Sequence, residues 1–100
     1  MSAARDRVTG VVSRLGEDFT VGGSARRGVF SPMARGVAAS FLSQTVLNDA
    51  SLPVVGVLVA HDDATETDDT VVWNGLSKPV RNVVEARLRG EVVAKLLVLG

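Results

Sequence analysis

The sequence predicts a mainly β protein, a small antiparallel β-barrel or sandwich of about six strands with an N-terminal helix and a long inserted loop. Three observations support this. A helical apolar pattern is clear only at the start of the chain, apolar or alternating runs separated by hairpin turns fill residues 54–100, and only four of the 100 residues are aromatic. Such a core consists mainly of valine, leucine and alanine, and branched side chains suit strands. One hundred residues make a single domain, 1–100.

Residues 1–16 are predicted to form the N-terminal helix. Their apolar residues follow the i, i+3, i+4, i+7 spacing of one helix face: Val8, Val11, Val12 and Leu15. Ser2 is a candidate N-cap, and Gly16 follows the last periodic residue, as is typical of a helix end. Gly10 and three valines lower the intrinsic helix propensity, so we expect packing on another surface to stabilise this helix.

Residues 18–31 are predicted to form a first hairpin of two short strands, 18–21 and 27–31, joined by the loop Gly22-Gly23-Ser24-Ala25. Residues 32–53 are then expected to form a long loop, because turn-like sequence flanks both of its ends. Residues 37–47 within it fit a strand or a short helix equally well. A stretch of this length without firm structure is often functional, although an irregular connection is the alternative.

Residues 54–100 are predicted to form a four-strand C-terminal half. The nearly continuous apolar run at 54–60 is typical of a strand covered on both faces. Asn74-Gly75 is a strong signal for a type I′ hairpin turn, because this turn needs two residues with positive φ. A second hairpin is expected at residues 89–91.

The strand between these two turns alternates along residues 78–88. One face is predicted to unite the apolar residues Val80, Val84, Ala86 and Leu88, and the other to unite Arg81, Glu85 and Arg87. Pro79 cannot donate a backbone hydrogen bond, so a bulge or a strand edge is expected there.

The overall composition excludes several classes of protein. The formal net charge is zero, from 11 basic and 11 acidic residues. A neutral chain with few aromatic residues lacks the electrostatic pattern of a dedicated nucleic-acid-binding protein, and little charge repulsion opposes its self-association. There is no cysteine, so disulfides and thiolate metal sites are excluded. No apolar run approaches the roughly 20 residues of a membrane helix and no signal peptide is evident, so we expect a soluble intracellular protein with no membrane partner.

The clearest chemical cluster is acidic: His61, Asp62, Asp63, Glu66, Asp68 and Asp69. It lacks the spacing of a calcium loop and the nitrogen ligands of a transition-metal site, so a solvated loop or charged contact surface is favoured over a metal site. A single histidine without a motif-marked serine does not indicate nucleophilic catalysis, so no enzyme activity, catalytic residue, metal or cofactor is expected.

Two features fit either a binding role or a purely structural one. Arg81, Arg87 and Arg89 either meet phosphates or form a solvated face paired with Glu85 and Glu91, and the second interpretation is favoured. Trp73 is either an exposed stacking platform or, as is more common in so apolar a strand, a core anchor.

The order of these elements resembles a known family. A helix ending at Leu15 precedes a first strand, then Arg27-Gly28-Val29-Phe30-Ser31 ahead of the long loop, and later Leu58-Val59-Ala60 before an acidic loop. The most specific part is Asp69-Thr70-Val71-Val72-Trp73-Asn74-Gly75 with Val80 downstream. From about residue 8 onward, the chain resembles the head–tail joining, or stopper, proteins of long-tailed bacteriophages and related gene transfer agents. It departs from that family at Leu76, where an aromatic residue is usual, and at Pro79.

The resemblance implies a structural virion protein of the head–tail connector. Six or twelve copies would form a ring that joins the portal and adaptor to the tail terminator or tail tube and closes the channel, where packaged DNA contacts it transiently. The protein would reside in the virion neck, and in the host cytoplasm before assembly. The long loop would gate the channel, with candidate residues Arg35, Gly36, Val37, Phe41 and Gln44. Candidate intersubunit or tail contacts are Asp62, Asp63, Glu66, Asp68, Arg81 and Arg87.

A gating loop implies that deleting residues 37–47 leaves a folded ring that leaks DNA, whereas unfolding would show that the segment is core structure. Two alternative functions stay open. One is a tail terminator or another neck component, and the other is a small nucleic-acid-binding β-barrel that stacks bases on Trp73.

Overall fold

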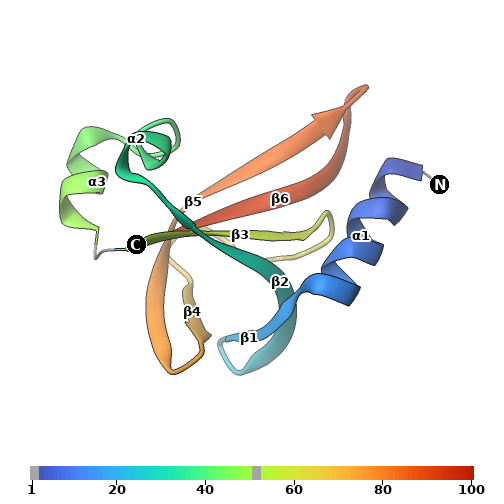
Figure 1. Ribbon diagram of the computed structural model, residues 1–100, viewed down its shortest axis with the longest axis horizontal. Helices are drawn as coiled ribbons and strands as arrows, with labels where there is room; N and C mark the ends of the chain where they lie inside the picture. Colours follow the sequence, from blue (N-terminus) through green and yellow to red (C-terminus); the bar gives the residue numbers. More distant parts are fainter. Residues whose placement is uncertain (1–2, 51–52) are drawn as a thin grey trace.

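The computed structural model describes residues 3–50 and 53–100. Six strands form a closed antiparallel barrel in the order β1-β2-β3-β6-β5-β4 (Figure 1). The predicted mainly β fold with an N-terminal helix is therefore confirmed. The strands are β1 Glu17–Val21, β2 Ser24–Met33, β3 Val54–Ala60, β4 Thr70–Trp73, β5 Leu76–Leu88 and β6 Glu91–Leu99. The helices are α1 Ala3–Leu15, α2 Arg35–Ala38 and α3 Gln44–Asp49.

Three two-residue turns join the hairpins, and both residues of each have positive φ. Asn74 and Gly75 have φ values of 50° and 78°, as the predicted type I′ turn requires. Arg89 and Gly90 repeat this geometry between β5 and β6. The first hairpin turn is shorter than predicted: only Gly22 and Gly23 form it, because Ser24 and Ala25 already pair with β1.

The barrel interior is an apolar cluster of Phe19, Val21, Val55, Val57, Val59, Val71, Val80, Leu97 and Leu99. Phe30 contacts Phe19 edge to face at a centroid distance of 5.6 Å and stacks on Trp73 at 4.2 Å. Trp73 is half-buried and packs against this cluster. Its placement matches the core-anchor interpretation better than an exposed platform.

Helix α1 lies along the outside of the barrel, against β2, β3 and β6 (Figure 1). Val12 is buried, whereas Leu15, predicted to share its face, is exposed. At the other end of the helix, Arg5 Nε donates to the Val92 carbonyl at 2.7 Å. Ser2, the predicted cap, lies outside the described residues. No helix among the described residues is long and apolar enough to cross a membrane.

The segment predicted as a long loop instead contains α2 and α3, which pack on the outside of the barrel. Ala38 of α2, Leu47 of α3 and Leu42 between them belong to a second apolar cluster completed by Val54 and Val98. Ser43 caps α3, because its side chain accepts a hydrogen bond from the Val46 N–H at 3.3 Å. The loop predicted over residues 32–53 was wrong at these two helices, whose four and six residues are too few to show a periodic pattern, and at residues 32–33, which belong to β2. The short-helix alternative for residues 37–47 is confirmed where α2 and α3 overlap that range. Residues 51–52 of the segment lie outside the described part of the chain.

Strand β3 is buried or half-buried along both faces, as its apolar run predicted. The interior cluster covers one face, and the second cluster at Val54 together with α1 covers the other. Strand β5 differs from its prediction. A β-bulge moves its pairing with β6 from Val80 to Asn82 without using Arg81, two residues beyond the bulge expected at Pro79. The extra residue reverses the alternation, so Val83, and not Val84, packs toward the interior together with Val80.

Candidate functional site

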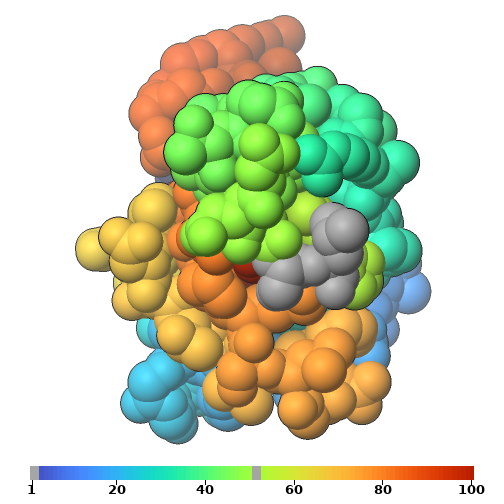
Figure 2. All heavy atoms as spheres, turned by 90° about the vertical axis from the view of Figure 1, so that its left-hand side faces the viewer, coloured from blue at the N-terminus to red at the C-terminus, as the bar shows by residue number. Residues whose placement is uncertain are grey.

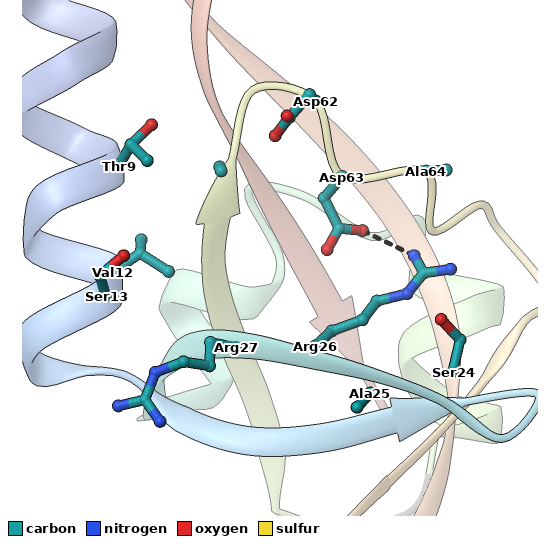
Figure 3. Close-up of a pocket in the computed structure, with 11 residues that line it drawn as sticks. Thr9, Val12, Ser13, Ser24, Ala25, Arg26, Arg27, Asp62, Asp63 and Ala64 are labelled. Atoms are coloured by element: carbon teal, nitrogen blue, oxygen red, sulfur yellow. Dashed lines mark hydrogen bonds and ion pairs between the residues drawn. The ribbon is translucent and has the colours of Figure 1, made fainter.

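The acidic connection, residues 61–69 between β3 and β4, is attached to the barrel by one of its aspartates. Arg26 of β2 donates to Asp63 Oδ1 at 3.0 Å and to Thr65 Oγ1 at 2.7 Å. Figure 3 shows the Arg26 and Asp63 side chains pointing toward each other, while Arg27 points away. The Thr65 N–H donates to the same Asp63 oxygen at 2.9 Å, and Lys95 Nζ donates to the Asp63 carbonyl at 2.8 Å. Asp63 therefore links the acidic connection to both β2 and β6.

This network assigns Asp63 a structural position. Its side chain is only 9% exposed, so it offers little surface to another subunit. Thr65, the one buried polar residue among residues 3–50 and 53–100, is 3% exposed and was missed by the sequence reasoning. A signal was present, because an aspartate whose side chain accepts from the N–H two residues later forms an Asx turn, and Asp63-Ala64-Thr65 fits that pattern.

We predict that Asp63→Ala lowers the free energy of unfolding by about 1–3 kcal/mol, because Arg26 and Thr65 then lose a partly buried acceptor. Chemical denaturation measures the change, and amide exchange at Thr65 should accelerate. Asp62→Ala, next to it and exposed, is the matched control and should change stability by less than about 0.5 kcal/mol. Equal effects of the two substitutions would contradict an anchoring role for Asp63.

The other predicted acidic contacts are on the surface. Asp62, Glu66 and Asp68 are exposed. The Asp69 carboxylate is used locally, since its Oδ2 accepts from the Glu66 N–H at 2.8 Å. Within residues 3–50 and 53–100, no three histidine, aspartate or glutamate side chains converge in a way that could hold a metal ion.

Arg81, a predicted contact residue, connects three parts of the same chain. Its Nε donates to the Gly100 carbonyl at 3.2 Å, and its Nη1 pairs with Asp49 Oδ2 of α3 at 3.2 Å. The neighbouring Asn82, which the sequence reasoning also missed, donates from Nδ2 to the Phe41 carbonyl at 2.8 Å. At the β5 bulge, the side chains of Arg81 and Asn82 therefore both bond to the segment that contains α2 and α3, and Arg81 also bonds to Gly100 after β6.

Four of the five predicted gating residues lie on or beside the two short helices, and two of them share a partner. Arg35 Nη2 and Gln44 Nε2 both donate to Asn48 Oδ1, at 2.8 and 2.9 Å. Phe41 is half-buried and packs against the second cluster. Gly36 and Val37 are exposed, Val37 at 52%. In Figure 2, α2 and α3 (teal to green) form the upper part of one face of the molecule, above the β4–β5 hairpin (orange).

Arg87, the last predicted contact, lies on the part of the β5–β6 hairpin that projects beyond the barrel (Figure 1). Its Nη2 pairs with Glu85 Oε1 at 3.0 Å, and both side chains are largely exposed. The favoured interpretation, a solvated face paired with Glu85 and Glu91, is confirmed for this ion pair only. Arg81 pairs instead with Asp49, and Glu91 pairs with Arg5 of α1 at 3.2 Å.

A hollow of about 430 Å³ lies between α1, β2 and the acidic connection (Figure 3). Both arginines that line it are engaged: Arg26 with Asp63, and Arg27 with Asp18 at 2.9 Å and the Gly16 carbonyl. Because both guanidinium groups already have partners, the hollow is better suited to holding the acidic connection against the barrel than to binding a phosphate.

No protein-family model, curated protein or solved structure matches the chain.

Proposed function

We propose that this protein is a structural subunit of the head–tail connector of a long-tailed bacteriophage or gene transfer agent. Copies of it would form a ring between the portal–adaptor assembly and the tail, closing the DNA channel. The observation that supports this proposal is the order of the elements along the chain. A helix, a hairpin, a surface insertion and four further strands follow one another as in the stopper proteins that the sequence resembles.

The candidate gating element is the α2–α3 segment, and its packing determines which part could act as a gate. Leu42 and Leu47 are buried against the barrel, and exposing each would cost about 1.5–3 kcal/mol. A gate that moved as a whole would therefore need a partner to cover those residues. The exposed tip at Arg35, Gly36 and Val37 could instead act while Leu42 and Leu47 stay packed, with Arg35 exchanging its hydrogen bond to Asn48 for a phosphate. A guanidinium there would meet the phosphates of the packaged DNA.

We predict that particles carrying Arg35→Glu retain less DNA than wild-type particles, because a negative charge at the tip repels the phosphate backbone. DNA retention is measured after packaging as nuclease-sensitive release. Arg14→Glu, also an exposed arginine but on α1, is the matched control and should retain DNA normally. Both variants should fold, since neither side chain is buried. Normal retention by Arg35→Glu would exclude a gating role for this tip.

The placement of the ring is a separate question from gating. A stopper binds the portal–adaptor complex, whereas a tail terminator binds the isolated tail tube. Binding assays with each purified assembly separate these two connector roles. Salt-dependent binding of oligonucleotides by the monomer, followed through Trp73, the chain's one tryptophan, would instead support the nucleic-acid-binding barrel.

A further inference from the structure

In the second half of β5, residues 82–88, one edge of the strand has no neighbouring strand within the described part of the chain. Strand β4 pairs with β5 only as far as Pro79, and backbone bonds from Asp68 and Asp69 extend this pairing only to Val80. Beyond that point, residues 82–88 pair with β6 on one side alone, with a register irregularity between Ala86 and Arg87 that skips Val93 of β6. Residues 85–90 are all exposed. Natural proteins usually cover or disrupt such an edge, because it offers N–H and C=O groups to another strand.

The sequence of this edge is complementary to itself. Residues 84–88 are Val84-Glu85-Ala86-Arg87-Leu88. If two copies pair antiparallel with Ala86 opposite Ala86, each Glu85 lies opposite the Arg87 of the other copy. Each Val84 then lies opposite the other copy's Leu88, which is 53% exposed in the single chain. Opposite charges and apolar pairs directly across an antiparallel ladder are both stabilising.

The charges of Glu85 and Arg87 also favour this register over registers shifted by two residues. Moving one strand by two residues in one direction places Glu85 opposite Glu85, and in the other direction places Arg87 opposite Arg87. Like charges directly opposite each other are destabilising. A shift by one residue would turn the apolar side chains of the two strands to opposite faces.

We propose that two copies of this protein dimerise about a two-fold axis through Ala86, by antiparallel pairing of residues 84–88 of β5. The interface is isologous, so each contact occurs twice. The zero net charge of the chain adds no repulsion between the copies. The ladder is short, and a small interface of this kind is typical of weak, concentration-dependent association. The dimer concerns the free subunit and does not depend on the proposed connector function.

The first test uses charge swaps and sedimentation velocity over a wide range of concentrations. Arg87→Glu and Glu85→Arg should each remain monomeric, because each places like charges opposite one another. The double variant Glu85→Arg/Arg87→Glu should dimerise as the wild type does. An equimolar mixture of the two single variants should form a heterodimer, because its opposing pairs are again oppositely charged. Circular dichroism confirms that each variant is folded.

The matched control is Arg89→Glu, which reverses a charge in the turn just outside the paired residues and should leave dimerisation unchanged. Wild-type protein that stays monomeric at every concentration would overturn the proposal. So would single variants that dimerise as the wild type does. A failure of the mixed single variants to associate would exclude this register.

The second test uses the absence of cysteine in the chain. Residues directly opposite in an antiparallel pair have Cα atoms about 4.5–5.5 Å apart, which is within the range that a disulfide spans. Ala86→Cys should therefore form a covalent dimer under mild oxidation or with a short thiol crosslinker. Ser40→Cys, at an exposed position after α2, should not. Equal crosslinking of the two variants would contradict the interface.

Discussion

Leu47→Ala is expected to lower the free energy of unfolding by about 2–5 kcal/mol, the range for a buried leucine replaced by alanine. Leu47 is 2% exposed and belongs to the second cluster, where α3 packs on Val54 and Val98. The substitution leaves a cavity that α3 can close only by moving along the barrel. Urea denaturation followed by circular dichroism measures the change.

The control for this prediction is Val37→Ala in the same segment. Val37 is 52% exposed, so its truncation should change stability by less than about 0.5 kcal/mol. If Leu47→Ala were as mild as Val37→Ala, the segment would behave as the loop that the sequence suggested. The structure also changes the outcome expected for deleting residues 37–47. Ala38, Leu42 and Leu47 are lost together, so we now expect destabilisation of the whole barrel.

Gly28→Ala is the second large effect, expected to destabilise the protein by about 1–3 kcal/mol through overpacking. A Cβ at Gly28 would lie 2.5 Å from Val57 Cγ1 and 3.1 Å from the Leu58 carbonyl oxygen. Val57 is fully buried and its branched side chain has little freedom to move aside. Thermal unfolding gives the sign directly, as a lower midpoint.

Gly10→Ala is the matched control and is expected to act in the opposite direction. Gly10 is inside helix α1, and a Cβ added there would meet no atom within 4 Å beyond its chain neighbours and the nearby backbone of its own helix. Replacing a helix-interior glycine by alanine stabilises by about 0.5–1 kcal/mol. The same chemical change should thus lower the midpoint at one position and raise it at the other. Destabilisation at both positions would show that the space around Gly10 is not as open as described.

Elements with strong local chemistry could be predicted from the sequence. Asn74 and Gly75 specify their turn without help from the rest of the fold, because both must adopt positive φ. The apolar run of β3 predicted burial on both faces, since a run without polar alternation fits no exposed sheet. Such strand and turn signals predicted the mainly β class, and the apolar spacing of the first 16 residues predicted where α1 lies in the sequence.

The features that were missed depend on contacts distant in sequence. The bulge at Arg81 accompanies bonds from its side chain to Gly100 and Asp49, and the alternation of residues along the strand cannot reveal such distant partners. The helices α2 and α3 are held by the outer face of the barrel, because helices this short are marginal alone. Asp63 differs from its acidic neighbours in sequence only by the Asx-turn pattern that it forms with Thr65, and its ion pair depends on Arg26 of the distant strand β2. Candidate contact residues could therefore be named from the sequence but not sorted into anchors and exposed surface.

The most direct test of the proposed function is a binding measurement with the purified portal–adaptor complex of the same phage or gene transfer agent. The connector proposal predicts that this protein binds the complex as a closed ring, visible as added ring density by electron microscopy, and that the bound ring retains packaged DNA. No binding to the portal–adaptor complex, under conditions where the protein is folded, would contradict it.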